Sequence, residues 1–234
     1  MRTIAVLSLA SLLAVTGCKD KPKRQNPPAN IGSAAQAGSG QRAAPDLVLP
    51  RGDGTPPKKT TAPLGKADFE KLSKLEYPGF TLEVRELTDK VVELRYKTKD
   101  HPRLWAVVTV QPCFDCIPME LDKWKAKTED LKVTLAGLKD EPNVDFEVGE
   151  TKLNGQPIMY TYQVGTGESK DEGGTTFGFT NNFYAYYNDG INQIKVAAAY
   201  KDDPVKKEDL VKLAPKADLE NLAISFLDAF THQW

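Results

Sequence analysis

Two cysteines three residues apart, Cys113 and Cys116, are the side chains of this chain best suited to chemistry. A C-x-x-C pair can close a short disulfide, exchange disulfides with another protein, or supply two ligands to a metal ion. The pair follows an apolar segment, residues 104–110, and precedes an amphipathic segment, residues 118–138. We therefore expect the thiols to lie in the turn between a strand and a helix.

A metal site at this pair would need further ligands. A closed zinc site takes four ligands, and the chain has only two histidines, His101 and His232, neither at ligand spacing to the cysteines. His101 lies between Asp100 and Pro102, as a turn residue does, and His232 is expected at a frayed helix end. We therefore predict no metal site and no cofactor, while the disulfide and the exchange chemistry both stay open.

The third cysteine, Cys18, bears on the compartment. Arg2 and the apolar run of residues 4–15 precede the small residues Thr16 and Gly17, which is the layout of a secretory signal. About a dozen apolar residues are too few to cross ~30 Å of hydrocarbon. The stretch resembles the lipobox of bacterial lipoproteins, which implies cleavage before Cys18 and acylation of its thiol and new amine. An ordinary signal peptide with a coincidental cysteine is the alternative.

The residue after the lipidated cysteine directs sorting in Gram-negative lipoproteins, where aspartate retains the protein at the inner membrane. Lys19 occupies that position here. The resemblance therefore implies an outer-membrane protein that faces the periplasm, or one on the outer leaflet of a single-membrane host. In such an oxidising compartment Cys113 and Cys116 are expected to form a structural disulfide. Its stabilisation should fall at the low end of ~2 to 4 kcal/mol because the loop is so short.

The alternative for the pair is thiol-disulfide exchange. Strand, C-x-x-C and helix come in the order of the thioredoxin family, and Pro157 follows at about the distance of that family's cis-proline. The resemblance would make Cys113 the nucleophile, Cys116 the resolving thiol and Pro157 a neighbour of the substrate. Two features oppose this. Pro118 delays the start of the helix and so weakens the dipole field at Cys113, and Asp115 stabilises the neutral thiol.

After the signal peptide of residues 1–17, residues 18–64 are rich in proline, glycine and polar residues. This composition predicts a disordered tether. Beyond Cys18 the tether carries eight basic and three acidic residues, a net charge of +5, which leaves −7 for residues 65–234 once Arg2 is counted. A basic tether is attracted to anionic lipid, whereas an acidic domain is repelled by nucleic acid. We expect a membrane partner through the lipid anchor and no nucleic-acid partner.

Residues 65–234 suffice for one folded domain. Helical periodicity predicts helices over residues 66–76 and 118–138 and a closing helix after Asp203-Pro204. Strand patterns run through residues 80–84, 91–97, 104–110, 144–153, 158–164, 183–187 and 191–200. Asn154-Gly155 and Asp189-Gly190 tolerate the positive φ of tight turns and predict two hairpins. The glycine-rich residues 165–176 are expected to form a solvated loop.

This order of elements resembles the PsbP-like family. The likeness rests on four short motifs: Pro78-Gly79-Phe80, residues 153–157 before an aromatic-rich strand, Asp189-Gly190, and Ser225-Phe226. It implies an α+β fold, in which an antiparallel sheet of about six to seven strands is flanked by helices as an α-β-α sandwich. Members of that family mostly act as binding or assembly modules, so the resemblance implies no catalytic residues.

Residues 183–187, Phe-Tyr-Ala-Tyr-Tyr, place aromatic side chains on both faces of one strand. Core packing under helices on both faces explains this pattern, with Trp105 and Trp124 in the same interior; an aromatic ligand cleft is the alternative. The sequence contains no phosphate-binding, zinc-protease or nucleophile-elbow motif. We expect a non-enzymatic envelope lipoprotein that binds an unknown envelope protein or small ligand, with a membrane-tethered oxidoreductase as the competing function.

Overall fold

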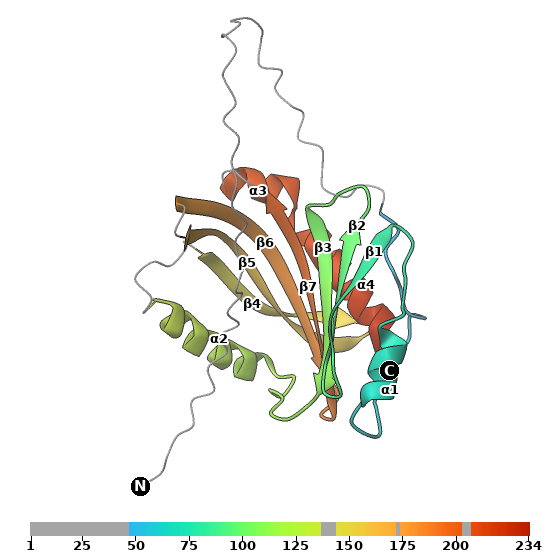
Figure 1. Cartoon of the computed structure of the whole chain (residues 1–234). Helices are drawn as coiled ribbons and strands as arrows, with labels where there is room; N and C mark the ends of the chain where they lie inside the picture. Colours follow the sequence, from blue (N-terminus) through green and yellow to red (C-terminus); the bar gives the residue numbers. More distant parts are fainter. Residues whose placement is uncertain (1–46, 137–143, 172–173, 203–206) are drawn as a thin grey trace, which may run out of the picture. The chain divides into compact units, whose positions relative to one another are not determined.

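The computed structural model describes residues 47–136, 144–171, 174–202 and 207–234. The elements are, in chain order, α1 (Lys66–Leu72), β1 (Phe80–Leu87), β2 (Val92–Thr98), β3 (Leu104–Pro112), α2 (Leu121–Ala136), β4 (Val144–Leu153), β5 (Gln156–Asp171), β6 (Gly174–Asn188), β7 (Asn192–Asp202), α3 (Lys207–Leu213) and α4 (Lys216–Thr231) (Figure 1). The predicted signal peptide and Cys18 lie outside the described residues.

The seven strands form one sheet in the order β1-β2-β3-β7-β6-β5-β4. Every pairing between neighbours is antiparallel. Helices lie against both faces of the sheet (Figure 1). This confirms the predicted α+β fold, an antiparallel sheet flanked by helices.

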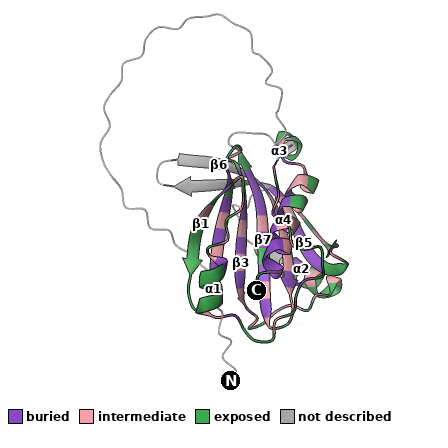
Figure 2. Cartoon of the chain, turned by 90° about the vertical axis from the view of Figure 1, so that its right-hand side faces the viewer, coloured by how far each residue is buried: buried purple, intermediate pink, exposed green. Residues whose placement is uncertain are grey.

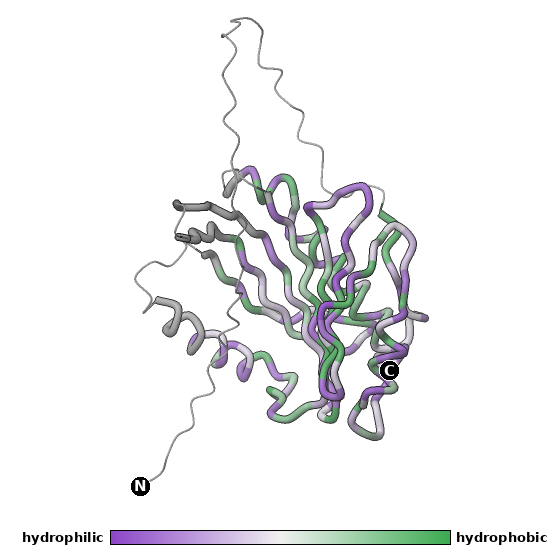
Figure 3. Tube along the Cα trace, in the orientation of Figure 1, coloured by the Kyte–Doolittle hydropathy of each residue, from purple (hydrophilic) through white to green (hydrophobic). Residues whose placement is uncertain are grey.

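The two faces of the sheet differ in burial. Along β3, buried and half-buried residues alternate because successive side chains point to opposite faces (Figure 2). Figure 3 shows the hydropathy of each residue along the same strands. The buried set, with Val108, Val196 and Phe183, lies on the face that α4 covers, which we call the α4 face. On the opposite face, which we call the α2 face, helix α2 contacts β4, and Trp105 and Val107 of β3 remain half-buried.

Aromatic rings dominate the contact between α4 and the sheet. Phe226 of α4 lies 4.6 Å from Tyr96 and 5.1 Å from Phe80, measured between ring centroids. All three side chains are at most 5% exposed. The buried hydroxyl of Tyr96 donates to the carbonyl oxygen of Leu75 at 2.7 Å, so the one polar atom in this contact has an acceptor.

Local turn chemistry fixes the β4–β5 hairpin. Asn154 and Gly155 have φ of 48° and 85°, and the flanking residues Leu153 and Gln156 are paired. Two successive positive φ values characterise the turn that matches the twist of antiparallel strands. The predicted hairpin is confirmed at these residues.

Two segments differ from the sequence-based expectation. The predicted loop of residues 165–176 is mostly strand, because β5 continues to Asp171 and β6 begins at Gly174. Thr166, Thr175 and Thr176 in this stretch favour extended backbone, and glycine does not prevent pairing. The closing helical region is divided into α3 and α4 at Pro215, which disfavours helix at the residue before it. Asp203-Pro204 lies outside the described residues.

Residues 47–64, which we call the strap, belong to the folded part. We expected the tether to extend over residues 18–64. In the structure, the main-chain N–H of Gly52 donates to the carboxylate of Asp228 on α4 at 2.7 Å, and Pro50 is buried. The described fold therefore begins N-terminal to the expected boundary at residue 65.

Candidate functional site

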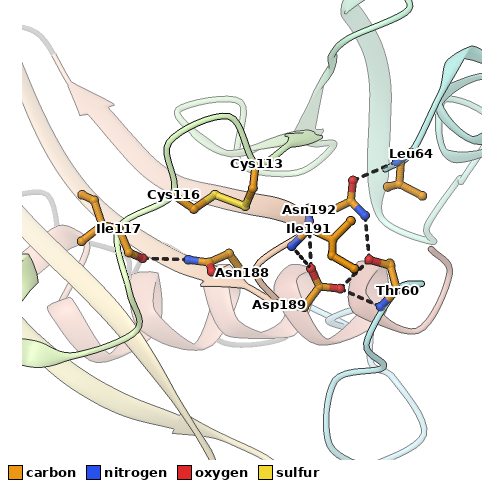
Figure 4. The surroundings of a disulfide bond; sticks show 9 residues. All are labelled: Thr60, Leu64, Cys113, Cys116, Ile117, Asn188, Asp189, Ile191 and Asn192. Carbon is orange, nitrogen blue, oxygen red and sulfur yellow. Dashed lines mark hydrogen bonds between the residues drawn. A yellow bond between two sulfur atoms is a disulfide. The ribbon is translucent and has the colours of Figure 1, made fainter. Parts of the chain in front are cut away.

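The C-x-x-C turn connects the end of β3 with the start of α2, and its cysteines are joined in a disulfide with Cα atoms 5.2 Å apart (Figure 4). The main-chain N–H of Cys113 donates to the carbonyl of Ile191 at 2.8 Å. The Asn188 side chain donates to the carbonyl of Ile117 at 3.0 Å. Both bonds reach the β6–β7 turn, so this turn and the disulfide turn hold each other in place.

Pro157 lies elsewhere in the sheet. It pairs with Lys152 on β4, and two strands, β7 and β6, separate β5 from β3. The described strands contain no central parallel pair of the kind a thioredoxin fold requires. Helix α2 begins at Leu121, three residues after the predicted start. The structure therefore brings Cys113 and Cys116 together but does not bring Pro157 to them.

The carboxylate of Asp189 organises the turn beside the disulfide (Figure 4). One oxygen accepts from the N–H groups of Ile191 and Asn192 at 2.9 and 2.8 Å. The other accepts from the main-chain N–H and the hydroxyl of Thr60, both at 2.6 Å. Burial raises the pKa of this carboxyl, but the hydrogen bonds from Asn192, Thr60 and Ile191 together lower the pKa below its ordinary value. The turn thereby binds the strap at residue 60.

We expected His232 at a frayed helix end, but the structure places it in a buried contact. Only 5% of its side chain is exposed; Nδ1 lies 2.7 Å from the carbonyl oxygen of Asp228, and Nε2 lies 2.8 Å from the carboxylate of Asp53 in the strap. His101 is a turn residue whose carbonyl accepts from Leu104 at 2.8 Å. Within the described part of the chain, no three His, Cys, Asp or Glu side chains are grouped as metal ligands. The described contacts of both histidines therefore hold parts of the fold together.

A pocket of about 150 Å³ opens between α2 and strands β4, β5 and β6 on the α2 face. We call it the aromatic pocket. Its lining residues are Trp124, Lys127, Thr128, Phe146, Thr161, Gln163 and Tyr186. The three helical residues share one side of α2 because they are spaced three and four apart. The strand residues reach the same space through the β4–β5–β6 register, which pairs Phe146 with Gln163.

Stacked aromatic rings form one wall of the aromatic pocket. The Trp124 and Tyr186 ring centroids lie 4.5 Å apart with an interplanar angle of 42°. Tyr184 also stacks with Tyr186, with ring centroids 6.4 Å apart and an interplanar angle of 21°. Burial raises the pKa of Tyr186 to about 12 and also raises that of Tyr184. Both phenols are therefore uncharged at neutral pH.

These residues differ from the expected core. Phe183 and Ala185 are buried on the α4 face, whereas Tyr184, Tyr186 and Trp124 are only half-buried. We predicted that residues 183–187 are packed into the core on both faces of the strand. Full burial is found only for the residues on the α4 face. The alternation of Phe, Tyr, Ala and Tyr along β6 marks two unlike faces, and this was the available signal for a pocket. Which helix covers which strands is set by contacts between distant residues, and no short sequence pattern reports them.

Positive charge lies beside the aromatic pocket. Lys127 lines the pocket and is exposed. Lys195 on β7 is the cross-strand partner of Tyr186, is also exposed, and projects from the same face. The nearest acid in this row of side chains is Glu150 on β4, beyond Met159. Two lysines from separate elements therefore lie next to residues of the pocket, one in its lining and one beside Tyr186.

The indole N–H of Trp124 is buried and donates to no acceptor among the described residues. Buried donors in native proteins are nearly always paired. Because Trp124 also lines the aromatic pocket, this donor without an acceptor belongs to a residue that a ligand in the pocket would contact. The pocket can thus hold an apolar ring and offer polar groups at its edge.

Comparisons with known proteins give no family for this chain. Neither the known protein families nor the curated proteins contain a match to it. Among the described residues, no helix has the length and apolar character needed to span a membrane.

Proposed function

We propose that the chain is a cell-envelope lipoprotein whose α+β domain is a non-enzymatic binding module and holds its ligand in the aromatic pocket. The observation that carries the proposal is the buried, unpaired indole N–H of Trp124 in the wall of a ring-sized pocket. Ligand sites combine such apolar walls with a few polar groups that orient the ligand.

Binding rather than catalysis is favoured by the chemistry of the pocket lining. The described lining residues comprise aromatic side chains, two threonines, a glutamine and a lysine, without the acid, imidazole or thiol that would activate a nucleophile. The phenol of Tyr186 stays protonated because burial raises its pKa. These groups can hold a ligand in place but offer no general base near neutral pH.

Binding at the pocket can be followed through the three tryptophans of the chain. We expect phenol, used as a small aromatic probe, to shift the indole ¹H–¹⁵N signal of Trp124 while leaving those of Trp105 and Trp234 in place. Trp124→Phe should weaken phenol binding at least about tenfold, because it removes the donor and part of the ring wall. Trp105→Phe is the matched control. Equal shifts at all three indoles, or none, would count against the pocket as the site.

The lipid anchor is the second part of the proposal. Arg2, the apolar run before Cys18 and the small residues at 16 and 17 support cleavage and acylation at Cys18. Lys19 supports an outer membrane location facing the periplasm in a Gram-negative host. One lipid chain gives only marginal membrane binding, whereas two chains anchor stably, and the +5 tether adds attraction to anionic lipid.

Fractionation of cells tests the anchor. We expect Cys18→Ala to yield an unprocessed or released protein, whereas a Cys113→Ser/Cys116→Ser variant should remain in the membrane fraction. Recovery of the Cys18→Ala protein in membranes at the normal size would contradict the proposal.

A thiol-disulfide oxidoreductase is the second candidate function. It is supported by the partly exposed disulfide and by Phe114 between the cysteines, whose side chain is 78% exposed. Insulin reduction tests it: activity that disappears in Cys113→Ser would favour exchange chemistry. An inactive protein would leave the disulfide with a structural role only.

A further inference from the structure

We infer that the aromatic pocket selects small aromatic anions, that is, a planar ring that carries a carboxylate. The inference rests on the proposed function, because it names the ligand class of the same pocket. It follows from two properties of the site: a wall of uncharged rings, and two lysines, of which Lys127 lines the pocket and Lys195 is the strand neighbour of Tyr186.

The ring of the ligand is recognised by the wall of the pocket. Trp124 and Tyr186 lie 4.5 Å apart, and Tyr184 continues the stack. Offset and tilted contacts between rings are worth about 0.5–1.5 kcal/mol beyond the burial of their area. Phe146 adds a further apolar surface from β4. A volume of about 150 Å³ suits a group the size of one ring.

The carboxylate is recognised by charge. Lys127 on α2 lines the pocket together with Tyr186, and Lys195 on β7 is the cross-strand partner of Tyr186. No acidic residue is among the described lining residues. Glu150 lies in the same row of side chains but is separated from Tyr186 by Met159. A cation bound in the pocket would be repelled by both lysines, whereas an anion gains from both.

The buried indole N–H completes the match. A carboxylate oxygen is a stronger acceptor than a neutral oxygen, and hydrogen bonds with one charged partner are roughly twice as strong as neutral ones. The Trp124 N–H needs an acceptor, and Gln163 contributes an amide to the same lining. An aromatic carboxylate supplies the acceptor and leaves its ring against Tyr186.

The test compares three compounds on the full chain: benzoate, its neutral analogue benzamide, and cyclohexanecarboxylate, which keeps the charge but has no aromatic ring. The readouts are the Kd from titration and the indole signal of Trp124. At about 20 mM salt, where the Debye length exceeds 20 Å, we expect benzoate to bind at least tenfold more tightly than either comparison compound. Salt at 500 mM should reduce the preference over benzamide to about twofold and leave the preference over cyclohexanecarboxylate, which has the same charge, unchanged.

The lysines are tested by a paired variant. Lys127→Gln/Lys195→Gln should bring the Kd of benzoate to within about twofold of that of benzamide and leave benzamide unchanged. Lys125→Gln/Lys212→Gln removes the same charge at exposed positions that do not line the pocket, and it should keep the preference. If this control lost the preference equally, net charge rather than the pocket would explain it, and the inference would be overturned.

Other outcomes separate this inference from the proposed function. Benzamide binding as tightly as benzoate, with the Trp124 signal shifted, would overturn the selection of anions and leave the pocket as a binding site. Cyclohexanecarboxylate binding as tightly as benzoate would overturn the aromatic selection in the same way. If none of the three compounds, and also not phenol, shifts the Trp124 signal, the proposed binding site itself fails.

Discussion

Gly52 is a residue for which even a methyl group is too large. A Cβ at this position would overlap Nδ1 of His232 and lie 2.7 Å from Oδ1 of Asp228. The same residue donates its N–H to the other oxygen of Asp228. The close approach of the strap to α4 therefore depends on the absence of a side chain at position 52.

We predict that Gly52→Ala destabilises the fold by about 1–3 kcal/mol, because the added methyl group must displace the His232 ring or the strap. Urea unfolding measures the change. Gly65→Ala is the matched control, since a Cβ there meets no atom within 4 Å. Equal stability of the two variants would contradict the close contact.

Asp189 makes the stability of the fold depend on pH. Its pKa is lowered in the folded state, so its ionised form favours folding. This contribution is fully present above the unfolded-state value of about 4, and it is lost as the pH falls through the lower folded-state pKa.

We predict that Asp189→Asn costs about 1.5–3 kcal/mol at pH 7, because charge-assisted hydrogen bonds to two segments are weakened. The difference from the unaltered protein should shrink at pH 3. Urea unfolding at both pH values measures it, with the exposed Asp89→Asn as control. A difference that does not depend on pH would show that the charge of Asp189 is not what matters.

At the scale of elements, local patterns account for much of the fold. The apolar stripe of α4 and the Asn154-Gly155 turn are encoded by residues within a few positions of each other, and both were predictable. The extension of β5 to Asp171 and the early start of β6 at Gly174 were not predictable. Glycine and charged residues there have low strand propensity, and the pairing of the two strands with each other outweighs it.

The packing of α4 on the sheet gives a prediction at this scale. Phe226→Ala should cost about 3–5 kcal/mol, because it leaves a cavity between Tyr96 and Phe80. Glu220→Ala, on the same helix but outside the buried stripe, should change stability by less than about 0.5 kcal/mol. Thermal unfolding of both variants checks this, and a cost below about 1 kcal/mol for Phe226→Ala would contradict the packing described.

At the scale of the whole molecule, the strap is the feature that the sequence concealed. Its prolines and glycines resemble those of a linker, and several of its hydrogen bonds reach residues more than 100 positions away. Leu64, for example, donates its N–H to the side chain of Asn192 at 2.9 Å, and Trp234 donates to the carbonyl of Lys58 at 3.0 Å. The aromatic pocket escaped prediction for the same reason, since it also joins distant segments.

We predict that a chain beginning at residue 65 is less stable than one beginning at residue 47 by at least about 3 kcal/mol. Deleting the strap leaves Asp189, Asn192 and Asp228 without several partners, and each buried polar group left unpaired costs about 1–3 kcal/mol. Urea unfolding of the two chains measures the difference. If the urea unfolding curves of the two chains had equal midpoints and equal slopes, the strap would contribute nothing to the stability of the fold.

The order of these attachments along the chain has a mechanical consequence. A pull on the chain from the N-terminal side of residue 47 first loads the packing of Leu47 and Leu49 against the core and then the bond between Gly52 and Asp228. The next contacts along the strap are those of Asp53 with His232, Thr55 with Asn154, and Lys58 with Trp234. Tension arrives at Thr60 and Asp189 only after these contacts. The strap contacts therefore lie in series between the N-terminal end of the described chain and the sheet, and a pull must break them one after another before it loads β1.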